Sequence, residues 1–218
     1  MNTVSKAVTI LAALALLGPT STSAQTPPAN TGASGNVNSS FQDAMWQVST
    51  DGGVTWGTAY QVQNKPAVWQ ANTPQYSWIS ATSTGSGGGG NYYFRTSFNL
   101  TGYDPTTATM TFQCAIDNYP VVNSYYSLNG GAYGGSCGST YNGYQFAGVN
   151  SVTSGFLPGN NTLTFHFTGD SVTDGLVVGD MTLSASAVTA TPEPASMMLL
   201  ATGLAGIFAA VRRRKAAR

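Results

Sequence analysis

Alternation of apolar and polar residues is the feature that most constrains how this chain folds. Within residues 109–116, Met110, Phe112, Cys114 and Ile116 occupy alternate positions, and the residues between them are mostly polar. Successive side chains of a β-strand point to opposite faces, so this pattern predicts a strand with one buried and one solvated face. Such half-buried strands are typical of antiparallel sheets.

Similar short segments recur along the chain, each followed by turn-forming residues. Alternation around Asp51-Gly52-Gly53 predicts a hairpin between residues 46 and 56. No segment of helix length between residues 44 and 189 has the helical period. The chain therefore predicts an all-β domain, an antiparallel β-sandwich or barrel. Beyond the hairpin, strands are expected at residues 76–79, 92–100, 109–116, 125–128, 162–168 and 175–187.

The N-terminus has the layout of a secretory signal peptide. Lys6 precedes an apolar run, Ala7 to Leu17, and small residues lead to a cleavage site expected after Ala24. The run is too short for a membrane helix and ends in a helix breaker, Gly18-Pro19. Residues 1–24 are therefore interpreted as a signal helix recognised by the Sec machinery, which implies export.

The C-terminus has three consecutive parts: Pro192-Glu193-Pro194, an uncharged apolar run from Ala195 to Val211, and a basic cluster of Arg212, Arg213, Arg214 and Lys215 within residues 212–218. A run of about 17 apolar residues is at the short end of what crosses a bilayer as a helix. Basic residues beside a span stay in the cytoplasm. The sequence thus predicts a transmembrane helix over residues 195–211, with the preceding domain outside the cytoplasm.

This tail resembles the PEP-CTERM sorting signal of Gram-negative bacteria, because Pro192, Glu193 and Pro194 match its name-giving motif. An ordinary C-terminal membrane anchor after a proline-containing linker is the alternative. The resemblance implies that exosortase, a membrane transpeptidase, recognises and processes the tail within residues 190–218. It also implies a place at the inner membrane before processing, then at the cell surface or in the extracellular matrix, with extracellular polysaccharide or biofilm as the setting.

One domain remains between the targeting segments. Residues 25–43 are rich in Pro, Gly, Asn, Ser and Thr and predict a flexible leader, and residues 44–189 form the β-sandwich domain. Export favours a disulfide between Cys114 and Cys137, with two free thiols as the alternative. The bond would close a loop of roughly 23 residues and stabilise the domain by about 3 kcal/mol.

Charge excludes one class of partner. Between Gln25 and Thr191 the cations are Lys65 and Arg95, and seven aspartates oppose them, which gives a net charge of −5. Such a domain cannot neutralise a row of phosphates, so nucleic acid is not expected as a partner.

Several short segments, in order, resemble the galactose-binding-like jelly roll found in carbohydrate-binding modules and in accessory domains of glycosidases. The resemblance covers about residues 77–187 and implies a jelly-roll sandwich, although function does not follow from the fold. The segments are Trp78-Ile79-Ser80, Tyr93 to Phe98, Ala115 to Asn118, Leu128-Asn129-Gly130, Phe156 to Leu163 and Gly175-Leu176. Separately, residues 49–56 are similar to the Asp-box hairpin of sialidases. This motif occurs once, so Asp51 is expected to bind turn amides and Trp56 to pack under the hairpin.

Catalysis is not predicted. His166 is the only histidine and is expected on the solvent face of a strand, and Glu193 is the only glutamate. A zinc site is excluded by one histidine and two paired cysteines. Asp170, Asp174 and Asp180 could supply two carboxylates for glycoside hydrolysis or hold a structural Ca²⁺, but solvated loop carboxylates are the preferred interpretation. No cofactor or metal is expected.

The sequence favours glycan binding over catalysis, because it offers many suitable side chains. Aromatic rings stack on sugar C–H surfaces, and amides and carboxylates bind hydroxyls; the tyrosine- and asparagine-rich loops favour a neutral glycan. The candidate glycan-binding residues are Asp117, Asn118, Tyr119, Tyr125 and Asn129. The sequence thus predicts an exported, non-catalytic, polysaccharide-associated surface protein. The alternatives are a structural or adhesive biofilm protein without a defined ligand, a carbohydrate-active enzyme and, most remotely, an ice-binding protein.

Overall fold

The computed structural model describes residues 28–86, 88–117, 125–138, 144–170, 172–188 and 194–216. The side chains of residues 125, 194–198 and 216 are outside this description. The chain divides into two units: Ser23–Val188, and the terminal segments Met1–Thr22 with Thr189–Arg218. The predicted signal peptide, Asn118, Tyr119, Pro192 and Glu193 lie outside the described residues.

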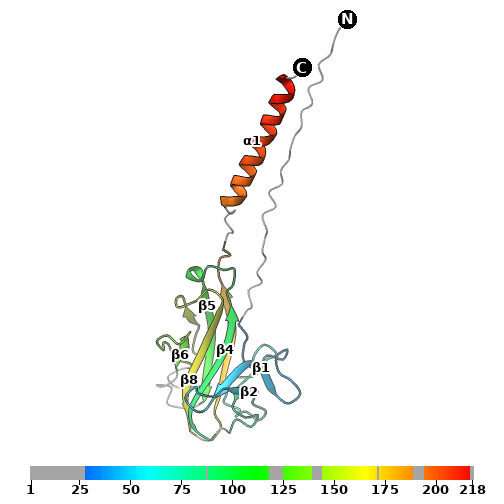
Figure 1. The fold of residues 1–218 in the computed structure, drawn as a ribbon. Helices are drawn as coiled ribbons and strands as arrows, with labels where there is room; N and C mark the ends of the chain where they lie inside the picture. Colours follow the sequence, from blue (N-terminus) through cyan, green and yellow to red (C-terminus); the bar gives the residue numbers. More distant parts are fainter. Residues whose placement is uncertain are drawn as a thin grey trace. The chain divides into compact units, whose positions relative to one another are not determined.

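Among its described residues, the first unit forms one sheet of nine strands, which pair in antiparallel fashion (Figure 1). The order across the sheet is β6-β8-β4-β1-β2-β3-β9-β5-β7. A 3₁₀ turn, η1, spans Pro105–Thr107. The strands are β1 (Gln42–Ser49), β2 (Gly57–Gln61), β3 (Ile79–Ser80), β4 (Gly90–Asn99), β5 (Thr109–Asp117), β6 (Tyr125–Leu128), β7 (Asn150–Val152), β8 (Asn160–Gly169) and β9 (Gly175–Ser184).

The sheet curls into a half-barrel, so that its two ends face each other across one core. The ring of Phe112 on β5 lies 5.4 Å from Phe165 on β8 and 5.0 Å from Tyr126 on β6. These strands stand near opposite ends of the strand order. The prediction of an antiparallel all-β domain is confirmed, and the more specific jelly-roll topology stays a prediction.

The period-two patterns correctly predicted which side chains are buried. On β5, Met110, Phe112, Cys114 and Ile116 are all buried, and Tyr92 and Phe94 on β4 are fully buried too. Burying these apolar side chains against the facing half of the sheet is the main source of stability, at about 1.5–3 kcal/mol for each large side chain. A second cluster contains Val62, Trp69, Trp78, Ala115 and Val177.

The prediction of a flexible leader over residues 25–43 is wrong for residues 28–43. Thr31 is fully buried, and its hydroxyl donates to the carbonyl of Ser77 (2.8 Å) and accepts from the amide of Val178 (2.9 Å). The buried carboxylate of Asp43 accepts from the amide of Gly32 at 2.7 Å. The prediction from composition was wrong because hydrogen bonds, rather than apolar contacts, bind this polar segment to the sheet. Buried polar residues that form such bonds leave no apolar pattern in the sequence.

The second unit contains the helix α1 (Pro194–Ala216), which confirms the predicted C-terminal helix. Its exposed residues include the basic cluster Arg212, Arg213, Arg214 and Lys215. Across the described residues, no helix meets the combined length and apolarity needed to cross a membrane. The structure does not confirm the membrane crossing predicted for residues 195–211.

Candidate functional site

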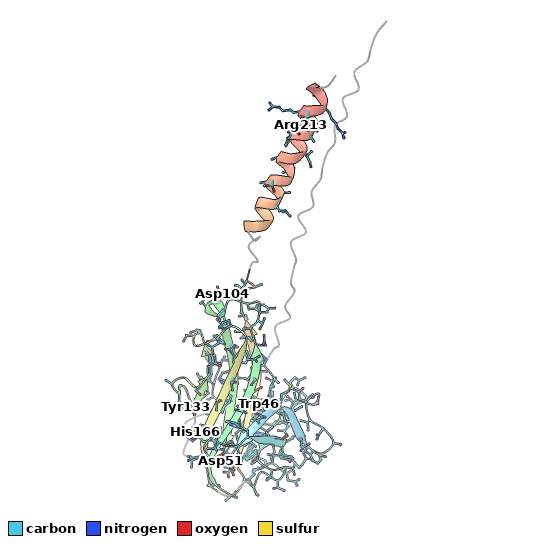
Figure 2. The ribbon with its side chains drawn as sticks, viewed as in Figure 1. Trp46, Asp51, Asp104, Tyr133, His166 and Arg213 are labelled. Atoms are coloured by element: carbon cyan, nitrogen blue, oxygen red, sulfur yellow. A yellow bond between two sulfur atoms is a disulfide. The ribbon has the colours of Figure 1, made fainter. Side chains whose placement is uncertain are left out.

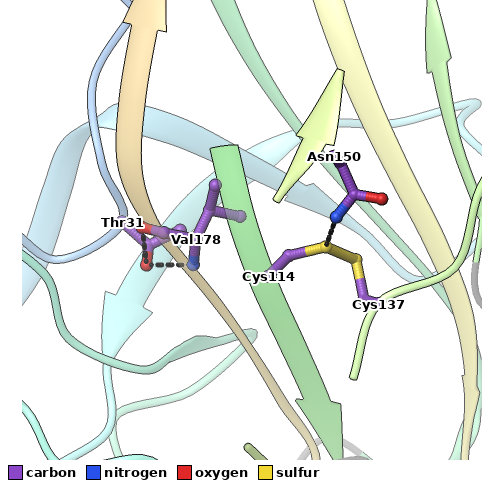
Figure 3. Close-up of a disulfide and its surroundings, with 5 residues drawn as sticks. All are labelled: Thr31, Cys114, Cys137, Asn150 and Val178. Atoms are coloured by element: carbon purple, nitrogen blue, oxygen red, sulfur yellow. Dashed lines mark hydrogen bonds between the residues drawn. A yellow bond between two sulfur atoms is a disulfide. The ribbon is translucent and has the colours of Figure 1, made fainter. Parts of the chain in front are cut away.

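The predicted disulfide between Cys114 and Cys137 is present, with the two Cα atoms 4.9 Å apart (Figure 3). Cys114 lies on β5, and Cys137 lies in the connection that follows β6. The amide of Gly138 donates to the carbonyl of Cys114 at 3.0 Å. The bond therefore fixes this connection against β5.

Asp117, a predicted glycan-binding residue, lies at the end of β5 and contacts the domain interior. Its Oδ2 accepts from the indole Nε1 of Trp69 at 2.7 Å. The pKa of Asp117 is raised to about 6. Burial is the main cause, the hydrogen bond from Trp69 opposes it, and the charges of Asp170 and Asp174 contribute to the rise. Three carboxyl groups therefore lie near one another at this end of the sheet.

Asn129 has a structural role instead. Its backbone has a φ of 54°, in the left-handed region, directly after β6. Its Nδ2 donates to the carbonyl of Gly155 and to Oδ1 of Asn161, and its Oδ1 accepts from the amide of Thr162, each at 2.8 Å. These bonds hold the turn that leads into β8.

The structure does not bring together Asp117 and Asn129, the two predicted glycan-binding residues whose side chains it describes. Asn129 contacts the start of β8, whereas Asp117 lies beside Asp170, which follows the end of β8. A strand rises about 3.3 Å per residue, so these two positions are about 30 Å apart. Of the other candidates, only the backbone of Tyr125 is described.

The predicted group of Asp170, Asp174 and Asp180 is divided as well. Asp174 is fully buried, and its Oδ1 accepts from the amide of Asp170 at 2.9 Å. Burial, followed by the charge of Asp174, raises the pKa of Tyr92 to about 12, which keeps this phenol neutral. Asp180 has a φ of 51° and lies at a bulge in β9, about 20 Å further along the chain. Among the described residues no group of three His, Cys, Asp or Glu is placed to hold a metal ion.

The Asp51 hairpin is confirmed as a self-contained turn between β1 and β2. The carboxylate of Asp51 accepts from the amide and hydroxyl of Thr55 and from the hydroxyl of Ser49. Hydrogen bonding to Thr55 is the main reason why the pKa of Asp51 falls to about 2. The indole Nε1 of Trp56 donates to the carbonyl of Gly53 at 2.9 Å, so the turn fixes this ring.

A row on the outer side of the sheet includes His166 on β8 and Tyr93 on β4, and these two residues were not predicted as a site. They occupy directly opposed positions in neighbouring strands. The rings of Tyr93 and His166 stack with centroids 4.4 Å apart, and Tyr133 lies 6.0 Å from His166 (Figure 2). Burial lowers the pKa of His166, which leaves the imidazole neutral at pH 7.

The next row on the same face contains a fixed cation. Arg95 on β4 lies opposite Gln47 on β1 and Thr164 on β8. Its guanidinium carbon is 3.9 Å from the centre of the Trp56 ring, and its Nε donates to Oε1 of Gln47 at 2.8 Å. We call the outer surface formed by Trp56, Tyr93, Arg95, Tyr133 and His166 the aromatic face.

The alternation of buried and exposed residues could have predicted part of the aromatic face. Tyr93 and Arg95 occupy the positions of β4 between its buried residues, and His166 does the same on β8. The sequence indicated that these side chains point outward, but not which strands are neighbours. Their proximity depends on the pairing of β4 with β8 and β1, which no local pattern specifies.

Comparison with protein families finds the PEP-CTERM protein-sorting motif at residues 190–215. This confirms the interpretation of the C-terminal tail. No curated protein shows significant similarity to the chain. The motif supports an exported protein that is sorted by exosortase, and it covers the terminal helix rather than the β domain.

Proposed function

We propose that this chain is an exported surface or matrix protein, sorted by exosortase, whose β-sandwich domain associates with extracellular polysaccharide without catalysing a reaction. The PEP-CTERM motif at residues 190–215 carries the proposal. The motif implies a C-terminal membrane anchor before processing, with Arg212 to Lys215 on the cytoplasmic side. The disulfide between Cys114 and Cys137 supports export, because such bonds persist in oxidising compartments.

The association with polysaccharide is supported by the aromatic face. Stacked rings beside hydroxyl and amide groups suit the alternating apolar and polar surface of a sugar. Tyr93 and His166 supply rings, and Asn91 accepts hydrogen bonds from Thr168 and lies within 3.3 Å of His166. The only histidine is thus surrounded by a tyrosine ring and an amide, which supports a non-catalytic role.

Two measurements test the proposal. Mass spectrometry of the C-terminus, in cells with and without exosortase, should show a shortened chain only when exosortase is present. Full-length protein, purified in a non-ionic detergent, should also co-sediment with polysaccharide isolated from the producing cells. An uncleaved product with reduced thiols in the cytosol would contradict export, and absence of co-sedimentation would contradict the association.

A glycoside-cleaving enzyme is the second candidate, because carboxylates converge at the end of β5. Asp117, with its pKa raised to about 6, suits a general acid, and exposed Asp170 suits the partner carboxylate. Reducing-end release from the isolated polysaccharide tests this candidate. Activity that disappears in both Asp117→Asn and Asp170→Asn would establish it over the binding role.

A further inference from the structure

The two cations of the β domain are used differently. The ammonium group of Lys65 donates to the carbonyls of Trp69 (3.2 Å) and Pro66 (3.4 Å), so its charge is satisfied within the domain. Arg95 has no such internal acceptor for its charge: within the described residues it contacts a ring and a neutral amide. A domain with only two cations thus presents one of them on an outer surface.

Arg95 is also held in place. Trp56 supports the plane of the guanidinium, and Gln47 takes its Nε–H. Trp56 is in turn fixed by the turn that the carboxylate of Asp51 organises. Holding the group in advance reduces the conformational entropy lost on binding. The two terminal amino groups of a guanidinium form a fork that matches a carboxylate, with two parallel hydrogen bonds.

The surroundings of Arg95 favour a sugar over other anions. Its neighbours on the same face are the ring of Tyr93, two residues away on β4, and the hydroxyls of Thr164 and Ser97. The carboxylate of Asp51 in the adjacent turn already accepts hydrogen bonds from the hydroxyls of Ser49 and Thr55. A single fixed cation beside an aromatic ring and hydroxyls suits a ligand with one carboxylate per sugar ring.

We propose that the aromatic face binds a uronic-acid polysaccharide, with the sugar carboxylate on the guanidinium of Arg95 and the sugar ring beside Tyr93. This rests on the proposed function and adds the class of sugar and the residue that selects it. It differs from the sequence-based expectation of a neutral glycan in the loops. A polyphosphate needs several cations, whereas this domain has only Lys65 and Arg95.

The experiment uses full-length protein in a non-ionic detergent and measures affinity for polygalacturonate, dextran and double-stranded DNA. The wild type should bind polygalacturonate and prefer it to the other two. Arg95→Gln should weaken this binding about 10- to 100-fold, because charge-assisted hydrogen bonds are lost. Arg95→Lys keeps the charge without the fork and should be intermediate. Lys65→Gln removes the same charge away from the aromatic face and should bind as the wild type does.

Competition on the unmodified protein keeps the test independent of folding in the variants. Free galacturonate should displace polygalacturonate, and galactose, which has the same ring without the carboxylate, should not. Equal loss in Arg95→Gln and Lys65→Gln, displacement by galactose, or tighter binding to DNA would each overturn the assignment. If the isolated native polysaccharide binds but Arg95→Gln changes nothing, the proposed function stands and this inference fails. If no polysaccharide binds, both fail.

Discussion

At the scale of single residues, the burial of Asp117 should make the stability of the fold depend on pH. The pKa of Asp117 is raised from 3.8 to about 6, mainly by burial and also by the charges of Asp170 and Asp174. A carboxyl group with a folded-state pKa above its unfolded value favours folding when protonated. Its contribution is therefore complete below about pH 4 and is lost as the pH rises to about 6 and above.

Asp117→Asn should consequently be more stable than the wild type at pH 7.5, with the difference narrowing towards pH 4. Asparagine removes the charge and retains an oxygen for the indole of Trp69. Midpoints of urea unfolding at the two pH values measure this. Asp104→Asn is the matched control with the opposite sign, because its bonds with Thr106 lower the pKa of Asp104. A wild type that is more stable than Asp117→Asn at pH 7.5 would contradict the assignment.

The hydroxyl of Thr31 connects the N-terminal segment to two distant parts of the chain, so its removal should destabilise the fold. It donates to Ser77 and accepts from the amide of Val178, which lies 147 residues away (Figure 3). Thr31→Val keeps the shape but leaves a buried amide and a buried carbonyl without this partner. We expect a loss of about 1–3 kcal/mol in the free energy of unfolding.

Thr31→Ser retains the hydroxyl, so its free energy of unfolding should fall much less than that of Thr31→Val. Thermal unfolding of the two variants measures this difference. Equal losses would mean that the methyl group of Thr31, rather than its hydroxyl, holds the N-terminal segment. In either case the domain extends to about residue 28, because this segment is packed on the sheet.

At the scale of elements, the connection after β6 closes the open side of the curled sheet. Gly134 exchanges backbone hydrogen bonds with Tyr126 on β6, and Gly138 bonds to Cys114 on β5. A stretch of five residues therefore joins strands near opposite ends of the strand order. The disulfide makes this junction covalent.

Replacing both cysteines by serine should reduce stability by about 3 kcal/mol, the loop-entropy value for 23 residues. Limited proteolysis of the variant should cut first between residues 129 and 149. Reduction of the wild type should reproduce both effects and should change nothing further in the variant. Unchanged stability would show that hydrogen bonds alone hold the two ends of the sheet together.

At the scale of the whole molecule, the β domain and the terminal segments are separate units. Removing residues 190–218 should therefore leave the midpoint of thermal unfolding unchanged, because the buried residues belong to the β domain. The same deletion should abolish sorting by exosortase, since it removes the matched motif. A lower midpoint in the shortened protein would reveal a stabilising contact between the units.

Local patterns in the sequence predicted the long strands β4, β5, β8 and β9, the buried faces of β4, β5 and β8, the disulfide partners and the sorting motif, but not β2 or β7. Each depends on residues close together in the chain or, for the cysteines, on having one possible partner. Where the predicted glycan-binding residues lie depends on the fold instead. Asp117 and Asn129 are only twelve positions apart, yet β5 and β6 place them at opposite ends of the sheet.

Only the tertiary structure decided that Trp56, Tyr93, Arg95, Tyr133 and His166 share one surface. Arg95 meets Trp56 because β4 pairs with β1, and Tyr93 meets His166 because β4 pairs with β8. Strand order and register depend on how the entire apolar set packs into one core, which is a property of the whole chain. Alternation therefore specified outward-facing side chains, and packing selected their neighbours.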